Sequence, residues 1–545
     1  MTIPRLRAAA ILLLMALASP WPAAAGEVAK NENTNVILIS LQCLRPDHLG
    51  AYGYKRETSK NIDALAKGSV LFENAIAQAN LTPVAQMSVF TSQYPRVNGM
   101  VSFEVAKDKV SQTTLPSVLK AYGYTTAATL SAPEFFMRYD AEMATMVNPG
   151  DLFSRSFDYY GRTIKGPGGG SIRKVPTDAL KWIRDNQEKK FFLWIGSGLL
   201  HMPYSAAVPL AQRTMYDPPK YTPFWKRLTI PEWKGKGEVN GDPSYDIFSR
   251  VFHNKFYWGG AEAYKLTEAD VQYVNARYDA GVYHTDLFIG ELLKLLDSLH
   301  LTEKTLVILH SIHGEELGEQ GNFFHYDVTD TVIKNALMIR FPKGEFGGKR
   351  VVEQVQGIDI MPTVLNYLEI PVPHEAQGSS LLPLLSGKNA TPPNEYAYID
   401  RMPWWEYTLS KWYLEFQSST GAHFAPSEKV KEYLAMLRAS FDSLTYPPGD
   451  IAIRSNQWKL IVRKHHALLN KVSWWSYITG QARDVPEMEL YDLVKDPGEK
   501  ANVVAQHPAE VALLKEKLLK WDATVESQRG EYNKDSSQRL IIPYP

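Results

Sequence analysis

The fold of this chain is decided by two stretches, Asn35-Val-Ile-Leu-Ile-Ser-Leu-Gln-Cys-Leu-Arg-Pro-Asp47 and Thr305-Leu-Val-Ile-Leu-His-Ser-Ile-His-Gly314. Each is a short apolar run that ends in a polar turn, a pattern typical of a buried strand. Similar runs occupy Thr125–Leu130, Phe191–Ile195 and Ala336–Phe341, and amphipathic segments occupy Thr114–Ala121, Pro176–Asn186 and Glu268–Leu299. This alternation predicts an α/β fold with a parallel or mixed sheet sandwiched by helices.

Three residues directly follow apolar strands and are the first candidates for a functional site. They are Gln42, His201 and Ile312. In sheets of this kind the functional crevice lies beyond the carboxyl ends of the strands. We therefore expect these three residues at one edge of the sheet.

Length and charge exclude one class of partner. The 545 residues are enough for one large domain and a smaller one, and 59 basic residues balance 59 acidic ones. A nucleic-acid-binding protein would carry a basic excess. No nucleic-acid partner is therefore expected, and the oligomeric state is left open.

The beginning of the chain predicts export. Arg5 and Arg7 precede an apolar run at 8–18, and Pro20-Trp-Pro-Ala-Ala-Ala25 supplies small residues for cleavage. We interpret residues 1–25 as a signal peptide, so that the protein is periplasmic or secreted. The alternative is a membrane anchor, but the run is shorter than the ~20 residues that a span needs.

The sole cysteine, Cys43, stands at the end of a hydrophobic strand. A single cysteine cannot form an internal disulfide, so the stability of an exported chain must come from its core. We expect Cys43 to be a buried, unreactive thiol rather than a nucleophile.

The second half of the chain predicts a smaller domain. An α/β domain at 35–385 is followed by an aromatic-rich connector or insertion at 386–450, a C-terminal α+β subdomain at 451–525 and a tail at 526–545. The subdomain contains a predicted hairpin at Ile451–Val462 and a helix at Pro508–Val525. In the connector, Trp404–Tyr413 is either a sugar-stacking platform, a lid or, as we favour, part of the subdomain core.

Seven motifs occur in a fixed order along the chain. They are Arg45-Pro-Asp-His-Leu-Gly-Ala-Tyr-Gly53, Asn61-Ile-Asp-Ala-Leu-Ala66, Phe90-Thr-Ser-Gln-Tyr-Pro95, His201-Met-Pro-Tyr204, His313-Gly-Glu-Glu-Leu-Gly318, Gly357-Ile-Asp-Ile-Met-Pro-Thr363 and Glu489-Leu-Tyr-Asp-Leu-Val-Lys-Asp-Pro-Gly-Glu499. In this order they resemble motifs of the sulfatase family, within the alkaline phosphatase superfamily. The resemblance implies a mixed sheet sandwiched by helices with a small C-terminal α+β subdomain.

The same resemblance implies an altered catalytic site. The position of the family's nucleophile, a formylglycine made from Cys or Ser, is Thr82, and the supporting arginine is replaced by Gln86. The family binds Ca²⁺ or another divalent cation, and two of its aspartate ligands correspond to Gln42 and Ile312, which leaves only His313. A hard cation prefers several carboxylates among roughly 6–8 oxygen ligands. We therefore expect no metal and no cofactor.

Several site residues allow more than one interpretation. Thr82, His201 and His313 match catalytic positions of the family, and Gln42, Gln86 and His325 are candidate ligand-binding residues. We expect Thr82 to be a helix N-cap followed by Pro83 at the first helical position. Arg45 and Asp47 are expected to form a structural ion pair.

Three functional hypotheses follow from these residues. The leading one is an exported, metal-free pseudoenzyme that binds an anionic ligand such as a sulfated or phosphorylated glycan, or a partner protein. The second is an active sulfuric or phosphoric ester hydrolase with Thr82 as nucleophile and His201 or His313 as acid and base. The third is a structural partner of an active sulfatase.

Overall fold

The computed structural model describes residues 31, 33–100, 113–131, 138–140, 145–147, 156–162, 175–202, 204, 207–222, 267–387, 395–401, 449–464 and 486–534. The predicted signal peptide at 1–25, the aromatic segment Trp404–Tyr413 and the end of the tail lie outside these residues. None of the helices in the described part of the chain is long and apolar enough to cross a membrane.

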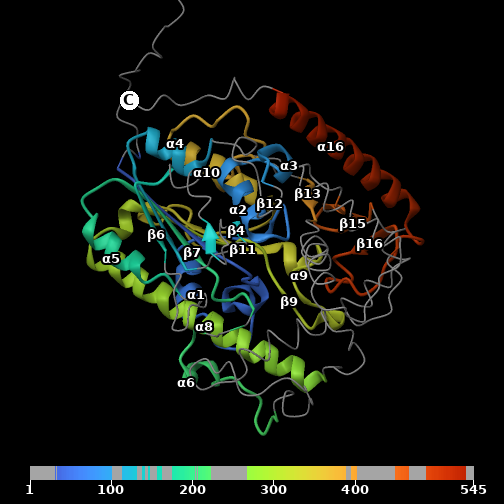
Figure 1. Ribbon diagram of the computed structural model, residues 1–545, viewed down its shortest axis with the longest axis horizontal. Helices are drawn as coiled ribbons and strands as arrows, with labels where there is room; N and C mark the ends of the chain where they lie inside the picture. The colour runs from blue at the N-terminus through green and yellow to red at the C-terminus, as the bar shows by residue number, and fades with distance from the viewer. Residues whose placement is uncertain are drawn as a thin grey trace, which may run out of the picture.

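A sheet of eight strands forms the centre of the large domain (Figure 1). In spatial order the strands are β12 (Arg350–Gln356), β2 (Val70–Ile76), β11 (Lys334–Arg340), β8 (Thr305–Ser311), β1 (Asn35–Leu41), β7 (Phe191–Ser197), β3 (Thr125–Leu130) and β6 (Tyr159–Arg162). β11 runs antiparallel to both of its neighbours, and the other pairs are parallel. The sheet is therefore mixed, as the sequence predicts.

Helices cover both faces of this sheet because alternate strand residues point to opposite sides. Ile37 and Ile39 of β1 face one core cluster, and Val36 and Leu38 face the other. The first cluster contains side chains from α1 (Lys60–Lys67), α5 (Asp178–Asp185) and α8 (Glu268–Ser298), and the second from α2 (Thr82–Thr91), α4 (Leu115–Ala121) and α10 (Ile360–Tyr367). Both faces of β1 are fully buried, which explains its continuous apolar run.

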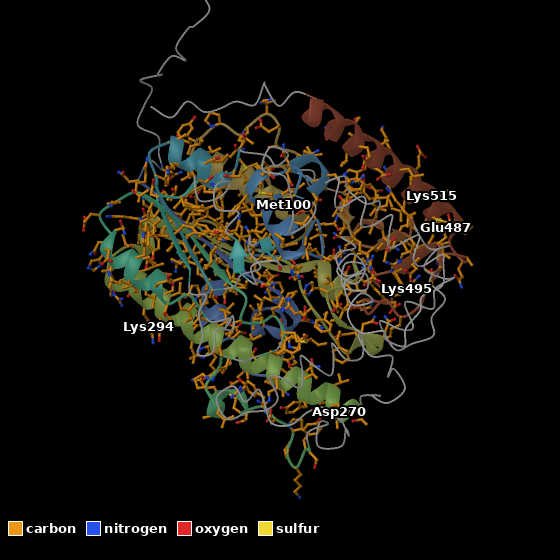
Figure 2. The ribbon with its side chains drawn as sticks, in the orientation of Figure 1. Met100, Asp270, Lys294, Glu487, Lys495 and Lys515 are labelled. Carbon is orange, nitrogen blue, oxygen red and sulfur yellow. The ribbon has the colours of Figure 1, made fainter. Side chains whose placement is uncertain are left out.

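The longest helix of the large domain, α8, is fixed at its start by a capping box. Thr267 accepts from the backbone N–H of Asp270, and the Asp270 side chain accepts from the Thr267 N–H. Figure 2 shows Asp270 near one end of α8 and Lys294 on its outward side. Helical spacing predicts one buried face formed by Tyr273, Ala276, Ala280, Tyr283, Leu287 and Leu292. All of these are buried except Tyr283 and Leu287, which are partly buried.

The smaller domain is a four-stranded antiparallel sheet covered by one long helix (Figure 1). Its strands are β13 (Ala397–Asp400), β14 (Ile451–Arg454), β15 (Trp458–Val462) and β16 (Met488–Asp492), and its helix is α16 (Pro508–Lys534). β13 comes from the connector predicted at 386–450, and α16 continues past residue 525 into the predicted tail. The predicted hairpin at 451–462 corresponds to β14 and β15.

Buried ion pairs attach this small sheet to the large domain. Arg463 is paired with Asp327, Asp450 and Glu489. Close by, Arg454 is 2.7 Å from Asp330. Because Asp327 and Asp330 immediately follow the loop that carries His325, the small sheet helps to position that loop.

A polar network lies inside the sheet just before the strand ends. Nδ1 of His310 is 3.0 Å from the carbonyl oxygen of Ser311, to which it donates. Its Nε2 therefore accepts from the Ser40 hydroxyl at 2.7 Å, and Ser40 in turn accepts from Trp194 Nε1 at 3.0 Å. The side-chain polar atoms of Ser40, Trp194 and His310 thus all have partners, as buried polar groups require.

This network predicts acid sensitivity. Burial lowers the pKa of His310 to about 4, so the folded protein binds this proton more weakly than the unfolded chain does. Its contribution to stability is present above pH 6.5 and is lost as the pH falls toward 4. Unfolding in urea should show that the free energy of unfolding falls between pH 7 and pH 4.5. This fall should be smaller in His310→Asn than in the wild type by on the order of 2 kcal/mol. An exposed control, His374→Asn, should keep the wild-type pH dependence.

Candidate functional site

The ends of β1, β7 and β8 place the first candidate residues together. The backbone N–H of Gln42 donates to Ser197 O at the end of β7, and the N–H of Ile312 donates to Leu41 O at the end of β1. Since β1 lies between β7 and β8, Gln42 and Ile312 continue neighbouring strands at the same edge. His201 follows β7 at this edge as well, as the sequence predicts.

Gln42, Gln86 and Ile312, which the resemblance aligns with charged residues, are all buried. Ile312 is 1% exposed and belongs to the apolar cluster that includes Val84 and Trp194. Gln42 and Gln86 are 1% and 0% exposed. Oε1 of Gln42 and both amide atoms of Gln86 have no hydrogen-bond partner. Such buried, unsatisfied atoms each cost about 1–3 kcal/mol unless something binds to them.

Thr82 and His313 form the central hydrogen bond of the site. Oγ1 of Thr82 lies 2.8 Å from Nε2 of His313, and Nδ1 of His313 lies 2.9 Å from the Gly314 carbonyl oxygen. Nδ1 must donate to that carbonyl, so neutral Nε2 is an acceptor and the Thr82 hydroxyl donates to it. Burial holds the pKa of His313 well below its usual value, and His325 nearby contributes to this effect. His313 is therefore neutral near pH 7 and has the arrangement of a base beside a hydroxyl.

The prediction that Thr82 caps α2 is wrong. The N-cap residue is Leu81, no side chain caps this helix, and Thr82 is already its first residue. The Thr82 hydroxyl bonds instead to His313, which is distant in sequence. The sequence Thr82-Pro83 thus predicted the start of the helix to within one residue. The direction of the Thr82 hydroxyl is set by its contact with His313.

A glycine lets His313 reach this position. A Cβ on Gly314 would lie 2.0 Å from the carbonyl oxygen of Thr331, closer than any side chain could tolerate. The Gly314 N–H donates to Val332 O at 2.6 Å. The chain after His313 therefore packs directly against α9 (Asp330–Ile333), and a larger residue would push the histidine away from Thr82.

His325 is held by a buried carboxylate. Its Nδ1 lies 2.6 Å from Oε2 of Glu315, and the other oxygen of Glu315 accepts from the Tyr204 hydroxyl at 2.8 Å. Burial, with Glu315 beside it, raises the pKa of Tyr204 well above its usual value, so Tyr204 stays protonated and donates. The His325 ring centroid is 4.4 Å from that of His313. This places His325 next to the Thr82–His313 pair.

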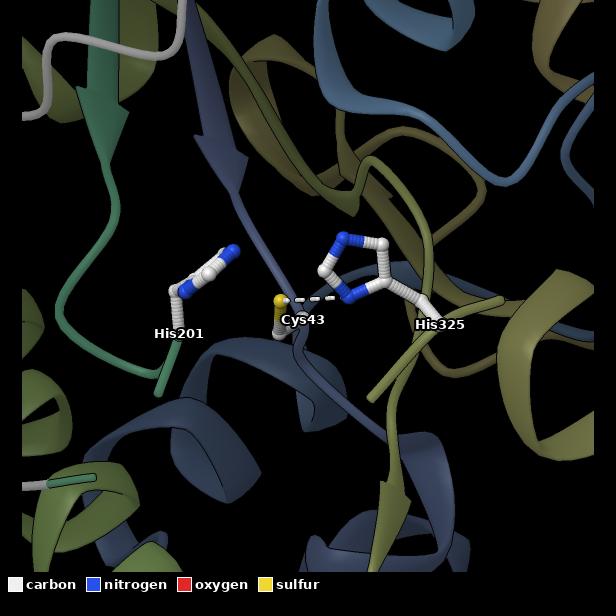
Figure 3. Close-up of side chains that lie close together, drawn as sticks. All are labelled: Cys43, His201 and His325. Carbon is white, nitrogen blue, oxygen red and sulfur yellow. Dashed lines mark hydrogen bonds between the residues drawn. The ribbon is translucent and has the colours of Figure 1, made fainter. Parts of the chain in front are cut away.

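His201 completes a group of three histidines. Its Nδ1 donates to the Met202 carbonyl oxygen at 2.8 Å, and its ring centroid is 5.2 Å from that of His325. His201 and His325 are partly exposed, whereas His313 is buried. The structure thus brings together the histidines that the sequence singled out, with Cys43 between His201 and His325 (Figure 3).

Arg45 and Asp47 form the structural ion pair that the sequence predicts. Their closest atoms are 2.7 Å apart, and Arg45 also lies 2.6 Å from Glu319 and donates to the Glu315 carbonyl oxygen at 3.1 Å. Arg45 therefore ties the turn after β1 to the loop that carries Glu315. The ion pair therefore stabilises the two segments that carry Cys43 and Glu315.

The residues at the family's cation-binding positions do not fit a hard divalent ion. Gln42 offers one amide oxygen, Ile312 offers a hydrocarbon packed in an apolar cluster, and Nε2 of His313 is the acceptor for Thr82. Ca²⁺ and Mg²⁺ are held by several oxygen ligands that include carboxylates.

Sequence reasoning missed Glu315, Tyr204 and the placement of Cys43 beside two histidines. Glu315 and Tyr204 stand in motifs quoted above, at His313-Gly-Glu and His201-Met-Pro-Tyr204. A carboxylate two residues after a candidate histidine was a signal that could have been used. Their hydrogen bond joins two loops that are far apart in the chain, and only the folded structure shows it.

A sequence model of one protein family, described as Sulfatase, matches residues 34–370. This chain belongs to the sulfatase family. The match covers β1, α2, β8 and the whole of the candidate site. The sulfatase-like fold predicted from the ordered motifs is thereby confirmed.

The relatives of this sulfatase-family chain are sulfatases of animals and bacteria. It is 26% identical over 352 residues to arylsulfatase K of Bos taurus, covering 62% of this chain and 53% of the relative. The chain thus spans about half the length of the arylsulfatase K proteins it matches. It is 21% identical over 590 residues to N-acetylglucosamine-6-O-sulfatase of Bacteroides thetaiotaomicron, covering 98% of this chain and 93% of the relative.

Solved structures share the fold across most of the chain. A protein in complex with its substrate D-glucosamine-2-N,6-O-disulfate has a TM-score of 0.60 and 18% identity, covering 93% of this chain and 99% of that one. The phosphonate monoester hydrolase of Silicibacter pomeroyi has a TM-score of 0.59 and 18% identity, covering 90% and 95%. At this identity the likeness concerns the fold.

The Thr82–His313 bond predicts a stability difference between two substitutions. Thr82→Val keeps the shape of the side chain but leaves Nε2 of His313 as a buried acceptor without a donor. The unfolding free energy should fall by about 1–3 kcal/mol. Thr82→Ser keeps the hydroxyl and should lose less than about 1 kcal/mol. Urea unfolding near pH 7 measures both, with exposed Thr524→Val as the control; equal losses for Val and Ser would contradict the assigned bond.

Proposed function

We propose that this sulfatase-family protein is exported and binds a sulfated or phosphorylated saccharide without hydrolysing it. The proposal rests on three uncharged residues at positions where the family pattern has charged ones, next to histidines that match the pattern. Gln42, Gln86 and Ile312 remove charge from the positions where the family places its cation ligands and supporting arginine. Export is inferred from residues 1–25, which have the composition of a signal peptide.

The buried amides supply hydrogen bonds for such a ligand. Gln42 and Gln86 present unsatisfied carbonyl oxygens, and Gln86 adds an unsatisfied amide nitrogen. Amides of this kind bind sugar hydroxyls and sulfate oxygens through neutral hydrogen bonds. Gln86 is the fifth residue of the ten-residue helix α2, whose N-terminus favours an anion through its free N–H groups and its dipole.

The exposed side of the site is lined by rings that can meet a saccharide. His201 and His325 are partly exposed and stand above the buried Thr82–His313 pair. One structural relative was solved with a disulfated glucosamine as its substrate. That ligand has the chemistry of the class proposed here, an anionic ester on a sugar ring.

A second candidate function, ester hydrolysis, is favoured by one specific observation. The Thr82 hydroxyl donates to neutral Nε2 of His313, which is the orientation a nucleophile and its base require. In such a reaction the Thr82 oxygen would attack sulfur or phosphorus while its proton passes to Nε2 of His313. The bond from sulfur or phosphorus to the sugar oxygen would break, and the sugar would leave as an alcohol after that oxygen takes a proton from the protonated His313. A third function, as a structural partner of an active sulfatase, would use neither Thr82 nor the amides.

Ligand binding can be measured with N-acetylglucosamine 6-sulfate and with N-acetylglucosamine as the uncharged comparison. We expect the sulfated sugar, but not the uncharged one, to raise the melting temperature of the full mature chain. A ligand that binds only the folded state stabilises the folded protein. Addition of millimolar Ca²⁺ should leave this shift unchanged. A shift of equal size with both sugars, or none with either sulfated or phosphorylated sugars, would contradict the proposal.

Gln86→Leu is the substitution that tests the amide directly. The dissociation constant for the sulfated sugar should rise by roughly 10-fold, since one or two hydrogen bonds are lost. The unliganded variant should be as stable as the wild type or more stable, because two unsatisfied polar atoms leave the core. Gln187→Leu, on the surface beyond α5, is the matched control and should change neither quantity.

Turnover separates the two main candidates. Release of 4-nitrophenol from its sulfate and phosphate esters should stay at background in the wild-type protein. Turnover that Thr82→Val abolishes and Gln187→Leu retains would establish the hydrolase instead. Co-purification of a sulfatase without binding of any sugar would favour the structural role.

A further inference from the structure

Cys43, His201 and His325 converge from three different elements. Cys43 follows β1, His201 follows β7, and His325 follows the short strand β10 (Phe323–Phe324). One ligand atom from each lies within 4.8 Å of the other two. Figure 3 shows the Cys43 sulfur between the two imidazole rings. The set consists of one thiol and two imidazoles, which are softer ligands than the carboxylates that the family uses.

From this geometry we propose a site for Zn²⁺, or a similarly soft divalent ion, on Cys43, His201 and His325. Zn²⁺ binds thiolate at about 2.3 Å and imidazole at about 2.0–2.1 Å, so tetrahedral ligands lie roughly 3.3–3.8 Å apart. The Cys43 sulfur is 3.9 Å from Nδ1 of His325. The three ligand atoms lie within 4.8 Å of one another, so an ion would draw them together through rotation of the side chains, two of which are partly exposed.

The hydrogen bonds of His201 match those of a metal ligand, and His325 has a carboxylate beside the nitrogen that faces Cys43. Nδ1 of His201 donates to the Met202 carbonyl oxygen at 2.8 Å, and Nδ1 of His325 lies 2.6 Å from the Glu315 carboxylate. Metal-binding histidines generally donate their other ring N–H to a carbonyl or carboxylate, as His201 does, which leaves its Nε2 with the lone pair. In His325 the nitrogen nearest to Cys43 is Nδ1 itself, so an ion bound there would replace the proton between Nδ1 and Glu315. Tyr204 fixes the second oxygen of Glu315 and so fixes the orientation of the carboxylate.

The backbone at the cluster is strained in a way that aims these side chains. Cys43 has a φ of 60° and Phe324, directly before His325, has a φ of 72°. Non-glycine residues in this left-handed region cost on the order of 1–2 kcal/mol and cluster at functional sites. Tyr278 holds the Cys43 turn in place, since its hydroxyl donates to the Cys43 carbonyl oxygen at 2.6 Å and accepts from the Arg45 N–H at 2.8 Å.

Three protein ligands leave the fourth position of a tetrahedral ion open. Zinc sites that bind water or a substrate have this arrangement, whereas structural zinc sites have four protein ligands. The His313 ring lies next to His325, with ring centroids 4.4 Å apart, so the Thr82–His313 pair is close to the proposed ligands. The sequence predicts no metal because carboxylates are missing. Missing carboxylates disfavour hard cations, whereas thiolate and imidazole ligands favour softer ones.

Cobalt substitution tests this site on the full mature chain after removal of metal by a chelator. Because Cys43 is the only cysteine, any thiolate-to-cobalt charge-transfer band must come from it. We expect such a band in the near ultraviolet, saturating at one equivalent of Co²⁺ and disappearing when Zn²⁺ is added. No band, or a band without saturation at one equivalent, would overturn the proposal.

Substitutions assign the ligands and control for folding. Cys43→Ser should abolish the band, and His201→Gln and His325→Gln should each weaken Co²⁺ binding at least tenfold. Exposed His374→Gln is the matched control and should bind as the wild type does. Zn²⁺ should raise the melting temperature of the wild type but not of Cys43→Ser; an equal rise in both would also overturn the site. Sugar binding is measured separately on the metal-free protein. A negative cobalt result would therefore contradict the zinc site, and a negative sugar result would contradict the proposed function.

Discussion

The hydrogen-bonded register of three buried parallel strands is the constraint on which the site depends. β8, β1 and β7 are paired residue for residue, and the pairing continues one step beyond the strands through the N–H groups of Ile312 and Gln42. A slip of one residue would exchange the two faces of β1 and turn its apolar side chains toward the wrong helices. The positions of the site residues are thus fixed by the core, and their chemistry can vary without moving the scaffold.

How far the sequence predicts this molecule depends on whether a feature is local. The runs at 36–41 and 125–130 predicted β1 and β3 closely because burial of both faces leaves only apolar residues there. The direction of the Thr82 hydroxyl was mispredicted because its partner, His313, is distant in the chain. Glu315 escaped notice for the same reason, since its role is defined by His325 and by a tyrosine from another loop.

Apolar and polar buried groups lie side by side in the site. Ile312 belongs to the apolar cluster that also contains side chains of α2. The amides of Gln42 and Gln86 leave buried polar atoms unsatisfied. A site that had simply decayed would be expected to fill with apolar groups, because buried unsatisfied amides are destabilising. Their persistence beside ordered histidines is the physical reason for considering a bound ligand.

The ion pairs of Arg463 have a consequence for how the two domains depend on each other. Arg463 holds Asp327 against the small sheet, and Arg401 donates to the carbonyl oxygen of Tyr326, the residue after His325. The site in the large domain therefore depends on the small sheet, because Arg401 and Arg463 stabilise the loop that carries His325 from positions 75 and 136 residues later in the chain. A shortened chain ending after the first domain would keep Thr82 and His313 yet lose the brace on His325, so recognition and scaffold cannot be separated by trimming.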